Sequence, residues 1–348
     1  MKTNDLSVKL NAIMEKWDFS GCISICKDSE VIYQGYHGYA DYEARKPNDL
    51  ETRFLIASVT KQFTAACIMM LAEEGKINLQ HTLDNYLPEY TYASQITIRQ
   101  MLNMMSGIPD MINEVIVEEI EQDNTERTQK EQLIFEYQTQ SRCFSLSEVL
   151  ELVNNRELNF EPGTSMNYSN TNYSFLGFIV ERLSGQSLGT FMEERIFRPL
   201  HMNETTCNPS MATSIGYARM DGKIVRLGYG NDMSGDGCIV TTATNLSLWL
   251  NAVLTKNAIL SKQSWEQILT MVPNPDKSNW LENYGFGWDK TGPWYQHNGG
   301  DMGYVTFVFM CFEKMITVAI CQNLEALPLD VPAGRVEFEM MQCIEETI

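Results

Sequence analysis

At the start of the chain, the pattern of hydrophobic and polar positions predicts a hairpin followed by a long helix. Residues 21–27 and 30–40 are rich in β-branched and aromatic side chains on either side of a short polar turn, which predicts two strands. Residues 59–75 then carry apolar side chains at helical spacing, and Gly75 suits the end of that helix. The amino-terminal part of the chain is therefore expected to combine strands with a long helix.

The middle of the chain, from about 80 to 210, has mainly helical periodicity interrupted by loops. Thr97 and Ser145 are expected to cap two of its helices, and Ser145 has Glu148 at the spacing of a capping box. Residues 113–140 are rich in Glu and Gln, which indicates a solvated helical excursion or a flexible loop over one face. The helices predicted here are 96–105, 145–155 and 171–183.

Strand patterns return towards the carboxyl terminus. Residues 307–312 and 315–321 are two β-rich runs around the polar pair Glu313-Lys314, which predicts a hairpin with a two-residue turn. Shorter strands are expected at 284–288 and 294–297, and a final amphipathic helix at 333–346.

This order of elements predicts an α+β protein with an antiparallel sheet that is flanked by helices and built from both chain ends. We expect a single domain over residues 7–346. Within it, residues 1–79 and 211–348 would form an α/β lobe, and residues 80–210 an inserted, mainly helical lobe.

The net charge of the chain limits the kinds of binding partner that are expected. The 348 residues include 45 acidic and 26 basic side chains, a net charge of −19. Such a surface repels phosphate backbones and anionic lipid, so nucleic-acid and membrane-surface partners are not expected. The longest apolar run, 304–312, is too short to span a bilayer, so no transmembrane segment is expected.

The cysteines and the amino terminus indicate a compartment. Nine cysteines are scattered without a Cys-x-x-Cys pair, and the four histidines are dispersed, so no metal site is expected. Reduced, buried thiols fit best, which favours a reducing environment. The amino terminus is polar and lacks the apolar core of a signal peptide. These features predict a cytoplasmic protein, or a secreted one if the amino terminus has been trimmed.

Ser58 and Lys61 are the first candidate catalytic pair. They stand three residues apart at the start of the predicted helix 59–75, so their side chains share one helix face. A desolvated, neutral lysine beside the positive end of a helix can remove the proton of a serine hydroxyl. The pattern alone is weak, because a serine that opens a helix is usually just a cap.

Two later segments add polar groups suited to the same chemistry. Tyr168 and Asn170 lie on a loop just before the helix 171–183; a phenol can relay a proton, and an amide can orient Lys61 and a substrate. The alternative is a packing ring and a helix N-cap. His297, Gly299 and Gly300 follow in a glycine-rich strand, whose bare backbone could donate to an oxyanion. The alternative there is a glycine-rich bulge with an exposed histidine.

Together, and in this order, Ser58-x-x-Lys61, Tyr168-x-Asn170 and His297-x-Gly299 resemble the three motifs of the serine β-lactamase and penicillin-binding protein superfamily. The tyrosine in the second motif is similar to the branch of class C β-lactamases, D-Ala-D-Ala carboxypeptidases and family VIII-type esterases. Segments 96–102, 106–110 and 284–288 also resemble that family, so the likeness spans roughly residues 20 to 325.

The resemblance implies a β-lactamase/transpeptidase-like fold and an acyl-enzyme at Ser58. Lys61 and Tyr168 would share general base and acid duties, and the order in which they act is left open. The backbone N–H groups of Ser58 and Gly300 would form the oxyanion hole, and Asn170 would hold the substrate amide. Water would then release the acyl group from an ester, an amide or a β-lactam.

One residue departs from the family pattern. His297 stands where many β-lactamases have lysine, and a histidine would hold a substrate carboxylate less firmly than a permanent cation. This weakens a strict β-lactamase assignment and favours an esterase or a D-amino-acid peptidase acting on small esters, amides or short D-peptides. Residues 113–140 are a candidate specificity lid.

Two other interpretations stay open. Gly185-Gln186-Ser187-Leu188-Gly189 matches the nucleophile elbow of α/β-hydrolases, which requires a strand before the serine. The chain could also be a non-catalytic or slowly acylating penicillin-binding sensor. No Gly-x-Gly-x-x-Gly, P-loop or His-Glu-x-x-His motif is present, so no cofactor and no metal are expected. Nothing in the sequence predicts the oligomeric state.

Overall fold

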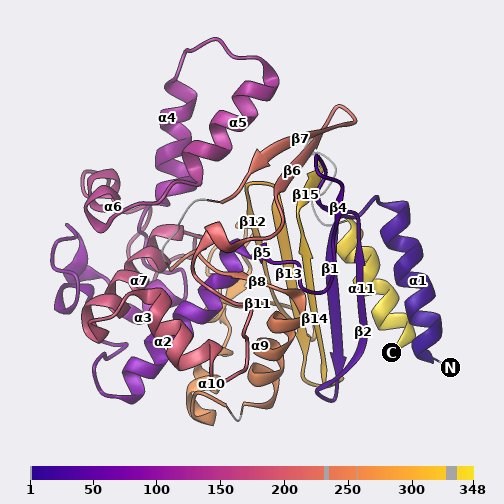
Figure 1. Cartoon of the computed structure of the whole chain (residues 1–348). Coiled ribbons are helices and arrows are strands. Elements are labelled where there is room, and N and C mark those ends of the chain that lie inside the picture. Colours follow the sequence, from indigo (N-terminus) through magenta and orange to yellow (C-terminus); the bar gives the residue numbers. More distant parts are fainter. Residues whose placement is uncertain (1, 231–234, 257, 327–334) are drawn as a thin grey trace.

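The computed structural model describes residues 2–230, 235–256, 258–326 and 335–348. Its central element is an antiparallel sheet in the spatial order β11-β12-β13-β14-β1-β2 (Figure 1). In β1, Ile23 lies opposite Ile320 of β14, so the two ends of the chain complete one sheet, as predicted. The strands are β1 Gly21–Lys27, β2 Glu30–His37, β11 Asp289–Thr291, β12 Trp294–Asp301, β13 Tyr304–Cys311 and β14 Ile316–Gln322.

Helices cover both faces of this sheet. The terminal helices α1 (Lys2–Lys16) and α11 (Arg335–Thr347) pack against each other over one face, where Val318 and Ile320 contribute to a shared core (Figure 1). Helix α9 (Ala243–Thr255) packs on β1 and β14, and Ala319 belongs to the larger core. Because successive strand residues face opposite sides, the continuous apolar run in β14 reflects burial on both faces. Helix α1 was not predicted.

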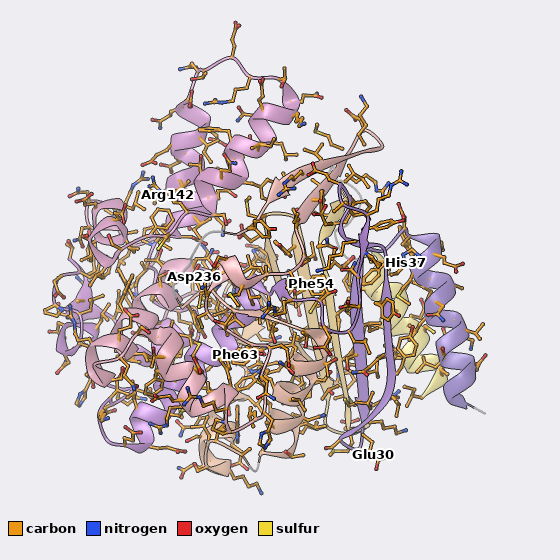
Figure 2. The ribbon with its side chains drawn as sticks, in the orientation of Figure 1. Glu30, His37, Phe54, Phe63, Arg142 and Asp236 are labelled. Carbon is orange, nitrogen blue, oxygen red and sulfur yellow. The ribbon has the colours of Figure 1, made fainter. Side chains whose placement is uncertain are left out.

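A mainly helical region lies beside the sheet, centred on α2 (Thr60–Glu73) and α7 (Asn170–Ser184), which pack against each other (Figure 1). Figure 2 shows Phe63 of α2 among the side chains that fill the interior, whereas Glu30 lies at the exposed end of the β1–β2 hairpin. The remaining helical elements are η1 Ala57–Val59, η2 Leu83–Asn85, η3 Ala93–Gln95, α3 Ile98–Leu102, η4 Met111–Ile116, α4 Val117–Gln122, α5 Gln129–Gln140, α6 Leu146–Val153, α8 Leu188–Met192, η5 Glu193–Phe197, η6 Pro209–Met211 and α10 Lys262–Ile268.

Short strands connect these parts. Strand β5 leads into the long helix and pairs with β8, while β15 extends the β6–β7 hairpin beside the upper end of the sheet (Figure 1). Their bounds are β3 Tyr39–Asp41, β4 Lys46–Pro47, β5 Phe54–Leu55, β6 Gly216–Met220, β7 Lys223–Gly228, β8 Val240–Thr241, β9 Val272–Pro273, β10 Asn283–Tyr284 and β15 Leu324–Ala326.

Both predicted helix caps are present. Thr97 caps α3, and Ser145 forms the predicted capping box with Glu148 at the start of α6. The predicted helix 96–105 is shorter in the structure, because the chain leaves the helical conformation at Asn103 and Met104 has φ 59°. The helical excursion predicted for residues 113–140 is present as η4, α4 and α5.

Two strand predictions were wrong in detail. The β13–β14 connection spans residues 312–315 rather than two residues, since pairing ends at Cys311 opposite Ile316. Residues 284–288 form a strand only at Tyr284, because Gly287 adopts φ 78° and lies against the backbone of α2. A Cβ on Gly287 would approach the Gln62 backbone nitrogen to 2.8 Å, so this close contact requires glycine.

The antiparallel sheet with flanking helices confirms the predicted α+β class. The division into two lobes, with boundaries near residues 79 and 211, stays a prediction. In the described part of the chain, no helix combines the length and the apolar character needed to cross a bilayer.

The buried Glu337 should make the folding stability of the protein depend on pH. Its side chain is buried where α11 meets the sheet and accepts a hydrogen bond from Gln322, and burial raises its pKa from 4.5 to about 7. The pKa of Glu337 is therefore higher in the folded than in the unfolded protein. The stability that this side chain contributes is fully present below about pH 4.5 and is lost as the pH rises through 7. Glu337→Gln should therefore show a smaller fall in the free energy of unfolding than the wild type between mildly acidic and alkaline buffers.

Urea denaturation at both ends of that pH range measures the difference between variant and wild type. Glu346→Gln, on the exposed side of the same helix, is the matched control and should follow the wild type. Equal pH slopes for Glu337→Gln and the wild type would contradict the prediction.

Candidate active site

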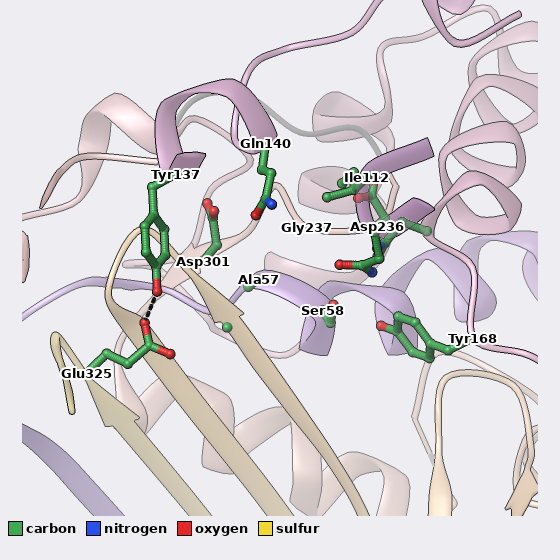
Figure 3. Close-up of a pocket in the computed structure, with 13 residues that line it drawn as sticks. Ala57, Ser58, Ile112, Tyr137, Gln140, Tyr168, Asp236, Gly237, Asp301 and Glu325 are labelled. Atoms are coloured by element: carbon green, nitrogen blue, oxygen red, sulfur yellow. Dashed lines mark hydrogen bonds between the residues drawn. The ribbon is translucent and has the colours of Figure 1, made fainter. Parts of the chain in front are cut away.

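Ser58 lies in the sharp connection between β5 and α2. Ala57 before it adopts φ 45°, an uncommon conformation for a residue with a Cβ. Ala57 and Val59 are buried and Ser58 is half-buried, so this turn directs the serine hydroxyl into the adjoining cavity (Figure 3). The Ser58 side chain caps neither η1 nor α2, which excludes the alternative that it is only a helix cap.

Lys61 is fully buried one turn further along and touches three different chain segments. Its Nζ lies 2.9 Å from Ser58 Oγ, 2.7 Å from Asn170 Oδ1 and 3.0 Å from the Asp236 carbonyl oxygen. Burial lowers the pKa of Lys61 to about 8, although the nearby Asp236 and Asp110 carboxylates partly oppose this. About a tenth of the lysine is therefore neutral at pH 7, far more than for an ordinary lysine, and a neutral amine can accept the serine proton.

Asn170 is held in place by a carboxylate behind it. It is the first residue of α7 and caps nothing; its Nδ2 lies 3.0 Å from Asp110 Oδ2. Asp110 also caps η4 by accepting from the Ile112 and Asn113 backbone N–H groups. The Asn170 side-chain oxygen is thereby fixed towards Lys61, because its amide nitrogen already has an acceptor.

Tyr168 lies next to both Ser58 and Lys61. The Lys61 Nζ lies 4.9 Å from the centre of its ring, and Figure 3 shows its hydroxyl directed towards Ser58. That hydroxyl is buried, and none of the described residues forms a hydrogen bond of normal geometry with it. Burial raises the pKa of Tyr168 well above 10, which the nearby Ser58 hydroxyl partly offsets. The phenol is consequently protonated at neutral pH.

Strand β12 forms a wall against the serine turn, and its two glycines serve different purposes. A Cβ on Gly299 would lie 2.2 Å from the Ile56 carbonyl oxygen and 2.9 Å from the Ser58 nitrogen, so glycine lets the strand approach the nucleophile. Gly300 is exposed, and a Cβ there would meet no atom closer than 4.0 Å. Its bare backbone borders the cavity instead.

His297 is buried, which contradicts the alternative of an exposed histidine on a bulge. Its Nε2 lies 2.8 Å from the Tyr284 hydroxyl and its Nδ1 2.6 Å from the Asn298 carbonyl oxygen. Burial and the Lys61 charge lower the pKa of His297 to about 3. The ring is thus neutral, donates from Nδ1 and accepts at Nε2. It therefore lacks even the partial positive charge that was expected of a histidine at this place.

These groups meet at a cavity of about 270 Å³ (Figure 3). Ser58, Tyr168, Asn170 and Gly300 line it, whereas Lys61 lies behind Ser58 and His297 behind Tyr168. Helix α5 adds Tyr137 and Gln140 from the segment considered as a lid. The other lining residues are Ala57, Ile112, Asn113, Asp236, Gly237, Asp301 and Glu325.

Sequence reasoning missed several of these groups. Asp236 is buried against Lys61 and accepts a hydrogen bond from Ser174 at 2.7 Å, and burial raises its pKa. Asp110 and Tyr284 were noticed only as parts of family-like segments, without a role of their own. No local spacing relates these residues to Ser58, so only tertiary contacts reveal them.

The competing nucleophile Ser187 has a structural role. It caps α8, accepting from the Thr190 backbone N–H, and the element before it is helix α7. An α/β-hydrolase elbow requires a strand at that place. The structure therefore contradicts the elbow interpretation.

Comparisons with known proteins agree with this geometry. A family model described as Beta-lactamase matches residues 11–337. The chain belongs to the Beta-lactamase family. Its membership confirms the resemblance inferred from the three motifs and supports serine-hydrolase-type activity.

Individual relatives are distant. The chain is 26% identical to Penicillin-binding protein 4* of Bacillus subtilis (strain 168), over 93% of this chain and 72% of that protein. It spans from 57% to 72% of the length of the curated relatives it matches. A penicillin binding protein from Bacillus halodurans aligns with TM-score 0.76, 25% identity and coverage of 97% of this chain and 99% of that one. D-amino acid amidase from Ochrobactrum anthropi SV3, complexed with L-phenylalanine amide, aligns with TM-score 0.79, 22% identity and 99% coverage of both chains.

The two glycines of β12 should respond differently to alanine. Gly299→Ala should lower the melting temperature and slow acylation of Ser58, because its Cβ would displace the serine turn. Gly300→Ala should retain the wild-type melting temperature, since its Cβ has free space. Thermal unfolding followed by circular dichroism, with labelling by a fluorophosphonate, measures both effects. Equal destabilisation by the two substitutions would contradict this distinction.

Proposed function

We propose that the protein hydrolyses an ester or amide through an acyl-enzyme at Ser58. The observation that carries this proposal is the 2.9 Å contact between Ser58 Oγ and a buried, depressed-pKa Lys61 at the wall of a cavity. A serine hydroxyl without such a base is a poor nucleophile. Small amino acid amides and short D-peptides are the candidate substrates.

The pKa directions favour Lys61 as the first base. The pKa of Lys61 is lowered to about 8, whereas burial raises that of Tyr168 far above 10. A neutral amine can take the Ser58 proton as its oxygen attacks the carbonyl. A protonated phenol is instead suited to deliver a proton to the leaving amine or alcohol. Asn170, fixed by Asp110, keeps the amine directed at the serine and offers its amide edge to the substrate.

The remaining steps use backbone groups and water. The N–H groups of Ser58 and Gly300 would stabilise the oxyanion, and one such donor typically lowers the activation barrier by about 3 kcal/mol. After the leaving group departs, a water molecule attacks the acyl carbonyl. Its proton passes to the Lys61–Tyr168 pair, Ser58 regains its own, and the acid product is released.

Charge in the cavity favours esters and amides over β-lactams that carry a carboxylate. Among the described residues that line the cavity there is no Lys or Arg, and Asp236, Asp301 and Glu325 are acidic. His297 is neutral and cannot replace the missing cation. The fold also occurs in a D-amino acid amidase, which shows that it can house amide hydrolysis. Together these points support an esterase or amidase rather than a β-lactamase.

Labelling and turnover test the proposal. A fluorophosphonate probe should modify Ser58, as located by mass spectrometry, and Ser58→Ala should abolish both labelling and hydrolysis. Lys61→Met should slow acylation by about 10²- to 10⁴-fold, the usual contribution of a general base. Ser187→Ala is the control and should remain active.

The substrate panel consists of p-nitrophenyl esters, nitrocefin and D-alanyl peptides. Stable acylation without turnover of any of them would favour a penicillin-binding sensor and contradict the hydrolase. Label on Ser187 would contradict the site itself.

The pH profile provides an independent check. If neutral Lys61 is the base, kcat/KM should rise with pH and level off above about 8, its lowered pKa. Below that value the protonated ammonium cannot accept the serine proton. A neutral p-nitrophenyl ester is the suitable substrate, because its own charge does not change. A profile that falls as the pH rises through 8 would contradict this assignment.

A further inference from the structure

The cavity continues past Gly300 to an acidic end that the catalytic steps do not use. Asp301 follows Gly300 on β12, and Glu325 lies on β15 beside it (Figure 3). Ser141 donates to Asp301 Oδ2 at 2.6 Å, and the Tyr137 hydroxyl donates to Glu325. Both donors come from the segment that ends α5, so this segment and the sheet edge enclose the two carboxyl groups together.

Among the described residues, no positive side chain pairs with these two carboxyl groups. Their hydrogen-bond donors are neutral, namely two hydroxyls and the Met302 backbone, and no Lys or Arg belongs to the described lining of the cavity. Burial, together with the neighbouring Asp236 and Glu325 carboxylates, raises the pKa of Asp301 to about 7, although the hydrogen bond from Ser141 partly opposes this. Buried carboxylates normally occur paired with a cation, so a positively charged ligand would complete this group.

The rest of the cavity shows which part of a substrate would meet this end. The Tyr168 hydroxyl is buried and points towards Ser58 in the same cavity. It has no hydrogen bond of normal geometry within the described part of the chain, which leaves a place for a ligand atom. Tyr168 is the proposed proton donor to the leaving group, so the leaving group lies on its side of Ser58. Asp301 and Glu325 lie on the other side of Ser58 (Figure 3) and therefore face the acyl half.

We propose that Asp301 and Glu325 bind a cationic group on the acyl half of the substrate, such as the α-ammonium of an aminoacyl amide, ester or peptide. This rests on the proposed hydrolase function and adds its substrate class: compounds with a free amine. A cavity of about 270 Å³ is at the small end for ligand sites and fits a single aminoacyl residue.

Two matched anilides test this selectivity. Alanine p-nitroanilide, in D and L forms, carries the amine, and propanoic acid p-nitroanilide is the same molecule without it. The wild type should prefer the amine by about 10- to 100-fold in kcat/KM, the usual range for a hydrogen-bonded charge. Asp301→Asn and Glu325→Gln should each reduce this ratio towards one. The exposed Glu313→Gln, on the β13–β14 turn, is the control and should keep it.

The ratio does not depend on how much of a variant is folded, because the active fraction cancels. Protection of Ser58 from the fluorophosphonate by alaninamide, compared with propanamide, measures the same preference in the wild type without turnover. Equal use of both anilides and equal protection would overturn the ammonium site, while labelling at Ser58 would still support the hydrolase. Variants at residues 301 and 325 that keep the wild-type ratio would also overturn it. If Ser58 takes no label and no substrate is hydrolysed, the proposed function fails as well.

Discussion

An amine held in the protein interior is the constraint around which the rest of the site is arranged. Lys61 has no exposed surface, and its three contacts come from Ser58 in η1, the start of α7 and the segment at Asp236. Each contact is polar, so the cost of burying the amine is partly offset, yet burial still lowers its pKa to about 8. The packing that holds the lysine thus also lowers its pKa, which is what the proposed role as a base requires.

The central sheet supplies the wall of the cavity that faces the Ser58 turn. Strand β12 can approach the Ser58 turn only because Gly299 has no side chain, and its next residues, Gly300 and Asp301, then border the cavity. One strand thus carries a backbone donor beside the nucleophile and a carboxyl group at the far end. The pairing of β1 with β14 holds this strand in a rigid frame assembled from both chain ends.

The groups around the cavity that bear on the proposed substrate are separate from the proposed catalytic pair. His297 is neutral and buried, so it offers no cation to a substrate carboxylate, whereas Asp301 and Glu325 place two carboxyl groups at the other end of the cavity. Ser58 and Lys61 contact each other directly and do not involve these groups. In the proposed function, reaction type and substrate preference therefore depend on separate groups in one cavity, which is how a common fold supports different activities.

Local pattern in the sequence was sufficient for some features. Ser58 and Lys61 are one helical turn apart, Thr97 and Ser145 cap the helices that follow them, and the mainly apolar runs in β1 and β14 fit strands that are buried on both faces. These features depend on residues close together in the chain, so spacing alone specifies them. The neutral His297, the supporting Asp110 and Asp236, and the acidic end of the cavity were decided only in three dimensions. Their properties come from burial and from contacts between different chain segments, such as the hydrogen bond between Tyr137 and Glu325, 188 residues apart, which no local spacing encodes.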